Sequence, residues 1–146
     1  MDPNEIKSRT FMVVSQYRMF ISWWTVVDAT SRVLNSDFPS IVYYLQAHCR
    51  SPATFRRFKK MITTPLNEFL NSTKLVKDNL AALSKEVTVL IAVVSSNNPV
   101  SKDIFFSLYD IIGEMKEDLK EIFMDCKKHF KEFCLTRQMI LDHFRE

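Results

Sequence analysis

The chain has 146 residues, a formal net charge of +3 at pH 7 and a single glycine, Gly113; 47% of its residues are hydrophobic and 25% are charged. This balance is typical of a globular domain, and the scarcity of glycine argues against phosphate-binding loops, β-hairpins and nucleophile elbows. The net charge is too small to indicate nucleic-acid binding from bulk composition. We therefore expect an all-α protein with one domain over residues 1–146. Its expected function is the binding of a partner, not catalysis.

Apolar residues recur at helical spacing in the first third of the chain. The pattern predicts a helix over about 4–21 and a second one over about 23–36. Pro39 disfavours helix just before it, so the second helix is expected to end there. A short helix over about 40–45 follows.

The middle of the chain contains the segments that indicate how the helices are arranged. Ser51 and Pro52 have the residue types of an N-cap and a first helical position, so another helix is expected to begin there. Pro65 is expected to kink or end it. Residues 80–94 are apolar on every side of the helical wheel, which predicts a central helix surrounded by others. The β-branched residues in 87–94 leave a strand as the alternative there.

The last third of the chain predicts a loop and two more helical segments. Residues 96–99 have the composition of a loop. A helical period then runs from Ile104 to Phe133, with Gly113 as a break or bend, and residues 136–144 predict a short closing helix. Together the segments predict a bundle of about seven helices around the buried central one.

Side chains that support catalysis or metal binding are scarce. We find no carboxylate or nucleophile at a spacing that would force it close to His48, His129 or His143, and interpret each as a surface or satisfied histidine. Cys134 lies too far from Cys126 along a helix for a compact metal site. We expect no catalytic residue, no cofactor and no metal.

Signals for secretion and for membrane insertion are also missing from the sequence. The first residues lack the apolar stretch of a signal peptide. The apolar run over 87–94 is far shorter than the ~20 residues that a membrane helix needs. Three widely spaced cysteines fit reduced thiols better than a disulfide framework, so we expect an intracellular protein without an integral membrane segment.

Residues 55–60, Phe-Arg-Arg-Phe-Lys-Lys, alternate aromatic and basic side chains. One interpretation is nucleic-acid binding by phosphate contacts and base stacking. The favoured interpretation is an amphipathic helix whose aromatic residues face the core or a groove while the bases stay in water. Such a helix also suits a partner peptide that is apolar on one side and acidic on the other.

Several segments are similar to those of a known family. Residues 26–32, Val-Val-Asp-Ala-Thr-Ser-Arg, with Asp-Phe at 37–38, look like a BH3-bearing second helix, and residues 56–70 look like the helix that leads into BH1. With the buried central helix, this order resembles the Bcl-2 family of apoptosis regulators over roughly the whole chain. The BH1 signature Asn-Trp-Gly-Arg has only Asn-Ser-Thr-Lys at 71–74 as its counterpart, and the BH3 leucine and glycine are missing. Such departures resemble the divergent Bcl-2-like proteins of large DNA viruses.

The resemblance implies an apolar groove formed by the second, third, fourth and fifth helices that binds an amphipathic BH3 helix. Its candidate residues, six for the apolar lining and two for the cation that meets the BH3 aspartate, are Tyr44, Phe55, Phe58, Ile62, Phe69, Leu83, Lys74 and Lys77. Lys74 is the nearest counterpart of the BH1 arginine, with Lys77 as its substitute. A lysine lacks the bidentate fork of arginine, which implies a narrower range of partners. For each apolar candidate, a place in the core is the alternative.

The function implied by the resemblance is that of a pro-survival, anti-apoptotic protein that sequesters BH3 helices of pro-apoptotic proteins. Its location would be the cytoplasm, of the host cell for a viral protein, or the periphery of mitochondria. The alternatives are a binder of innate-immune signalling adaptors with the same fold, a basic helical nucleic-acid binder that uses residues 50–60, and, last, an enzyme. A homodimer formed through Trp23 and Trp24 also stays open.

Overall fold

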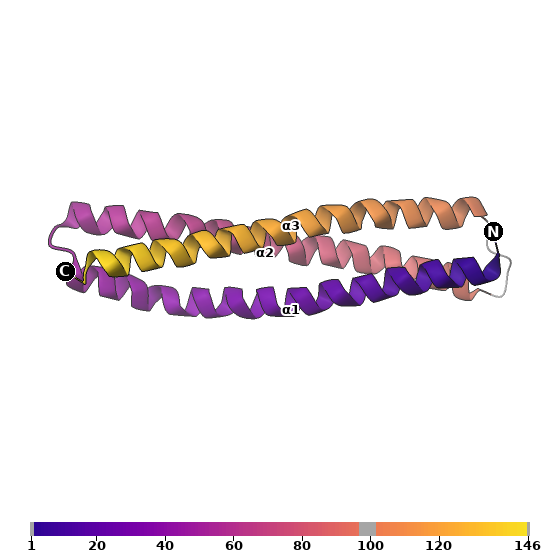
Figure 1. Cartoon of the computed structure of the whole chain (residues 1–146), viewed down its shortest axis with the longest axis horizontal. Helices are drawn as coiled ribbons and strands as arrows, with labels where there is room; N and C mark the ends of the chain where they lie inside the picture. The colour runs from indigo at the N-terminus through magenta and orange to yellow at the C-terminus, as the bar shows by residue number, and fades with distance from the viewer. Residues whose placement is uncertain (1, 97–101, 146) are drawn as a thin grey trace. The chain divides into compact units, whose positions relative to one another are not determined.

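The described part of the chain consists of three long helices. The computed structural model describes residues 2–96 and 102–145, and the helices in these ranges are α1 (Pro3–His48), α2 (Pro52–Ser95) and α3 (Lys102–His143) (Figure 1). The predicted all-α class is confirmed. Except for Ser96, the predicted loop over 96–99 lies outside the described residues.

Each helix contributes one segment to each of two compact units. Unit 1 comprises Met1–Thr25 and Leu75–Ile122, and unit 2 comprises Val26–Lys74 and Phe123–Glu146. We describe each unit separately. The single domain expected over residues 1–146 stays a prediction.

A seven-residue repeat places the buried side chains of a helix on one face. In α3 one set of buried residues is spaced by seven: Phe105, Ile112, Leu119, Cys126, Phe133 and Ile140. Phe123 is also buried, four residues after Leu119 and three before Cys126. In α2 the spacings alternate between three and four: Ile62, Leu66, Phe69, Thr73, Val76, Leu80, Leu83, Val87 and Leu90. This spacing, 3.5 residues on average, is typical of helices that pack lengthwise against each other. Each of these helices therefore has one continuous buried face.

Contacts within the units give the helix directions. In unit 2 the ring of Phe58 lies 5.0 Å from that of His143, and the ring of Phe69 lies 5.8 Å from that of Phe130. Because residue numbers rise along α2 as they fall along α3, these two segments are antiparallel. In unit 1, Arg9 of α1 lies 5.5 Å from the Tyr109 ring, and Gln16 accepts a hydrogen bond from Lys116. The segments of α1 and α3 in unit 1 are therefore parallel.

The first turns of α1 and α2 have the same capping pattern. The Asn4 amide donates a hydrogen bond to Oδ1 of Asp2 at 3.1 Å, and the Thr54 amide donates one to Oγ of Ser51 at 3.1 Å. A proline follows each capping residue, at a position where its missing N–H costs nothing. The predicted helix start at Ser51 and Pro52 is confirmed.

Several predicted helix boundaries are wrong. The helices predicted over 4–21, 23–36 and 40–45 are one helix, and Pro65 does not end α2. Likewise α3 runs through Gly113, which has no positive φ, and includes 136–143 of the predicted closing helix.

Continued burial explains why the prolines and the glycine do not end the helices. An interior proline costs about 3 kcal/mol, and an interior glycine about 1 kcal/mol relative to alanine. Burial of one large apolar side chain stabilises by about 1.5–3 kcal/mol. Leu34 and Leu45 are buried on either side of Pro39, and Ile112 precedes Gly113 in the core. Pro39 and Asn35 are both exposed, so water can bond the carbonyl that the proline leaves unpaired.

The predicted central helix over 80–94, buried on every side, is also wrong, and so is the arrangement of about seven helices. Leu80, Leu83, Val87 and Leu90 are buried, whereas Val89 and Ile91 are exposed. Unit 1 contains segments of three helices, too few to surround one of them. Residues 87–94 are helical, so the strand alternative fails as well.

A pair of adjacent residues distinguishes a single buried face from burial on every side. Leu90 is 0% exposed and Ile91 is 41% exposed. We expect Leu90→Ala to lower the free energy of unfolding by about 2–5 kcal/mol, and Ile91→Ala by less than about 1 kcal/mol, because only the first leaves a cavity. Urea denaturation followed by circular dichroism measures both. Equal losses for the two variants would contradict the single buried face.

Candidate functional site

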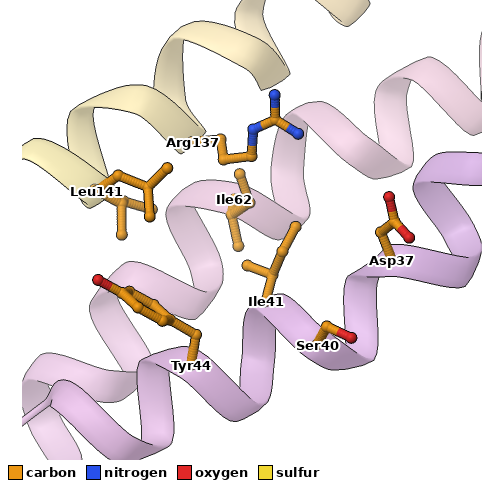
Figure 2. Close-up of a pocket in the computed structure, with 8 residues that line it drawn as sticks. Asp37, Ser40, Ile41, Tyr44, Ile62, Arg137 and Leu141 are labelled. Carbon is orange, nitrogen blue, oxygen red and sulfur yellow. The ribbon is translucent and has the colours of Figure 1, made fainter.

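An apolar pocket of about 220 Å³ lies in unit 2, with walls from all three helices (Figure 2). Its residues are Asp37, Ser40, Ile41 and Tyr44 of α1, Ile62 of α2, and Arg137, Ile140 and Leu141 of α3. Spacings of three, four and seven residues place the α1 members on one face of that helix. Tyr44 and Leu141 lie at one end of the pocket, and Asp37 and Arg137 at the other.

The size of the pocket indicates what it can hold. A cavity of roughly 150 Å³ accommodates benzene, whereas sites for drug-sized ligands and cofactors have volumes of roughly 300–1,000 Å³. At about 220 Å³ the pocket suits one large apolar side chain better than a whole small-molecule ligand.

Arg137 gives the pocket a polar edge. Its guanidinium lies 6.0 Å from the centroid of the Phe133 ring and is exposed. Among the described residues no carboxylate forms an ion pair with it. An acidic group that reaches this edge would therefore meet an arginine that forms no ion pair with a described carboxylate, with Asp37 at the same end of the pocket.

Aromatic rings hold the other end of the pocket in place. The Tyr44 ring stacks on His48 at 4.1 Å and meets the Phe144 ring edge-on at 6.0 Å. Nδ1 of His48 lies 2.9 Å from the Tyr44 carbonyl oxygen. The Phe58 ring lies 5.5 Å from that of Phe144 and 5.0 Å from His143. Tyr44 is thus a fixed wall. His48 and His143 are both exposed, which agrees with their interpretation as surface histidines.

The predicted groove residues fall into three classes. Phe58, Ile62, Phe69 and Leu83 are buried in the core, Tyr44 and Phe55 are half-buried, and Lys74 and Lys77 are exposed. Of the eight, Tyr44 and Ile62 line the pocket. Lys77 and Leu83 belong to unit 1, and the other six belong to unit 2. The BH3 groove itself stays a prediction.

Sequence reasoning missed Ile41, Arg137 and Leu141 as pocket residues. It placed a helix end at Pro39 and assigned Arg137 and Leu141 to a separate closing helix. The sequence did contain a signal for the α1 wall of the pocket, because spacings of four and three residues place Asp37, Ile41 and Tyr44 on one helix face. The approach of α3 has no such local signal.

The basic segment over 55–60 is an amphipathic part of α2. Phe58 is buried, whereas the four basic residues of the segment are exposed. This confirms the favoured interpretation of an amphipathic helix. The Arg57 guanidinium lies 5.1 Å from the Phe58 ring, and Nζ of Lys59 lies 5.8 Å from the Phe55 ring. These rings are engaged within the chain, which makes them poor platforms for stacking bases. Trp23 is exposed.

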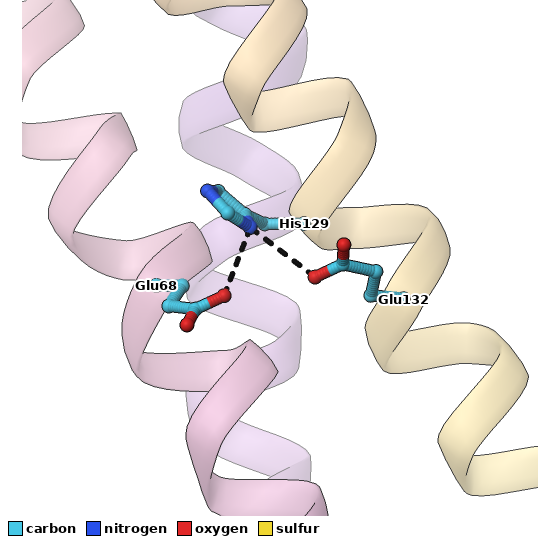
Figure 3. Close-up of side chains that lie close together, drawn as sticks. All are labelled: Glu68, His129 and Glu132. Atoms are coloured by element: carbon cyan, nitrogen blue, oxygen red, sulfur yellow. Dashed lines mark hydrogen bonds and ion pairs between the residues drawn. The ribbon is translucent and has the colours of Figure 1, made fainter.

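A second cluster in unit 2 joins α2 to α3 (Figure 3). Nδ1 of His129 lies 3.0 Å from Oε2 of Glu68 and 3.4 Å from Oε2 of Glu132. The expectation that His129 has no carboxylate partner is therefore wrong. The sequence does show that His129 lies three residues before Glu132, a spacing at which helical side chains meet. It does not show the contact of His129 with Glu68, which depends on how α2 and α3 pair.

Burial sets the chemistry of Cys126, which lies one turn before His129. Removal from water raises the pKa of the Cys126 thiol to about 11, although a hydrogen bond with the Thr73 side chain acts in the opposite direction. The thiol therefore stays protonated near neutral pH, which makes it a poor nucleophile and a poor metal ligand.

A comparison with protein-family models, with curated proteins and with solved structures found no match. Within residues 2–96 and 102–145, no helix combines the length and the apolar character that crossing a membrane requires.

The burial of Cys126 can be tested by alkylation. At pH 8.5 we expect iodoacetamide to modify Cys126 at least a hundredfold more slowly in the folded chain than in guanidinium, because a pKa two units above its ordinary value of 9.0 lowers the thiolate fraction about a hundredfold. Peptide mass spectrometry measures the rate. Cys134, which is half-buried, serves as the internal reference. A folded-state rate for Cys126 equal to its unfolded-state rate would contradict the packing.

Proposed function

We propose that the protein is a binding module, without turnover, that holds an amphipathic helix of a partner at the unit 2 pocket. The observation that supports this proposal is an apolar pocket of side-chain size with an arginine at its edge. Amphipathic helices commonly dock in this way, with apolar anchors in a groove and charged residues on its rim.

The lining suggests how the partner helix would lie. An apolar anchor in the pocket would contact Ile41, Ile62 and Leu141. An acidic residue about one turn away, ~5.4 Å along the partner helix, would reach Arg137. Arginine can bind a carboxylate through two parallel hydrogen bonds, which fixes the register of the partner as well as adding affinity.

BH3 helices of pro-apoptotic proteins have these two features, apolar anchors and an aspartate. We therefore retain BH3 sequestration, and with it a pro-survival role, as the specific form of the proposal. In this proposal Arg137 supplies the cation that meets the BH3 aspartate, the role that the resemblance implies for Lys74 and Lys77. The support for BH3 sequestration is the pocket, because the three helices formed by the described residues are not the seven-helix bundle of the Bcl-2 family.

Titration of the protein against a panel of BH3 peptides tests this proposal. We expect at least one peptide to bind with a micromolar or lower Kd. We expect Arg137→Gln to weaken that binding about fivefold, since an exposed ion pair contributes up to about 1 kcal/mol. Ile41→Ala should weaken it about tenfold, because it removes apolar contact with the anchor. Isothermal titration calorimetry measures each Kd.

The matched control is Arg145→Gln, which removes the same charge from an exposed arginine that pairs with Asp142 at 3.7 Å. This variant should bind as the unchanged protein does. For a peptide whose aspartate is replaced by alanine, the unchanged protein and the Arg137→Gln variant should have the same Kd. If no peptide binds, or if Arg137→Gln and Ile41→Ala bind as tightly as the unchanged protein, BH3 sequestration at this pocket is wrong.

A further inference from the structure

We infer that Glu68, His129 and Glu132 form a binding site for a zinc-type divalent cation that joins α2 to α3 in unit 2. The inference is independent of the proposed peptide binding. One ligand atom of each of the three side chains, Nδ1 of the histidine and an oxygen of each carboxylate, lies within 4.8 Å of the other two. Figure 3 shows the three side chains converging from the two helices.

The distances in the cluster suit tetrahedral coordination. Zinc bonds histidine nitrogen and carboxylate oxygen at about 2.0–2.2 Å, which places two ligand atoms of a tetrahedron about 3.3–3.6 Å apart. The two distances from Nδ1 of His129, 3.0 Å and 3.4 Å, are close to this value. The side chains of Glu68 and Glu132 are 46% and 43% exposed, so their carboxylates can adjust.

Charge favours a cation between the carboxylates. An oxygen of Glu68 lies within 4.8 Å of an oxygen of Glu132, and like charges at this distance repel each other. A divalent cation has the charge that the two carboxylates require. The side chain of His129 is 19% exposed, so the nitrogen ligand is partly shielded from water.

Packing on both sides of the cluster holds the two helices in register. The residues that follow Glu68 and His129 are Phe69 and Phe130, whose rings lie 5.8 Å apart. One turn away, Cys126 and Thr73 form the side-chain hydrogen bond. These contacts fix the backbones from which the three ligands extend, so little further ordering is needed when a cation binds.

The ligand types select the cation. One imidazole and two carboxylates suit zinc, cobalt or nickel, whereas calcium prefers six to eight oxygen ligands and magnesium keeps most of its waters. Three protein ligands leave a fourth position for water, as in zinc sites that are open to solvent. The sequence predicts no metal, because it does not show the approach of Glu68.

Titration of the full chain with Zn²⁺ tests the site. We expect one Zn²⁺ per chain, a rise in the thermal unfolding midpoint on binding, and at least tenfold weaker binding for both His129→Gln and Glu68→Gln. Calorimetry measures the affinity. Co²⁺ supplies a spectroscopic test, because tetrahedral coordination by this ligand set gives intense visible absorption that each of these variants should abolish. Ca²⁺ at the same concentration should not change the unfolding midpoint.

Two controls separate this site from other zinc ligands. Glu121→Gln removes an exposed carboxylate of α3 outside the cluster and should bind Zn²⁺ normally. A Cys49→Ser and Cys134→Ser double variant should also bind normally. Loss of binding in the double variant, or undiminished binding in His129→Gln and Glu68→Gln, would overturn the inference. If His129→Gln does not fold, Glu68→Gln and Glu132→Gln decide the question, because both carboxylates are on the surface.

Discussion

The seven-residue spacing of buried side chains is the constraint on which the rest of the structure depends. A helix with this spacing buries one continuous face and leaves its other faces to solvent. Along α3 buried residues recur at this spacing from Phe105 to Ile140, and Phe123 is buried between two of them. Apolar burial along the whole helix then outweighs local preferences against helix, which is why Gly113 and the interior prolines are tolerated.

The same constraint explains both the polar residues of the core and the position of the pocket. Thr10 and Thr73 are buried, and each hydroxyl donates a hydrogen bond to the carbonyl four residues earlier in its own helix, at 2.8 Å. The hydrogen-bonding capacity of these hydroxyls is thus met within the helix, so small hydroxyl residues can occupy the buried face. Ile41 follows Leu34 by seven residues but is only half-buried, and it lines the pocket. The pocket therefore lies where a position of the repeat is not fully covered.

Local patterns predicted the helical class, the start of α2 at Ser51 and the outward-facing bases of residues 55–60, because each depends on residues within one or two turns. They did not predict the continuity of the helices. Taken locally, Pro39 and Gly113 predict breaks, although the apolar phase of the flanking residues is unchanged across them. The apolar character of 87–94 indicated burial on all sides, but Ile91 is exposed because unit 1 has segments of three helices only.

The unit 2 sites required the pairing of helices, which no single segment encodes. Once α2 and α3 are continuous and antiparallel, the contact of Phe69 with Phe130 places Glu68 beside His129. The same two helices supply Ile62 and Arg137 to the pocket. A cation on Glu68 and His129 would favour the register of α2 and α3 that also shapes the pocket. If that register binds the peptide more tightly, linkage requires the peptide to raise the affinity for the cation by the same factor.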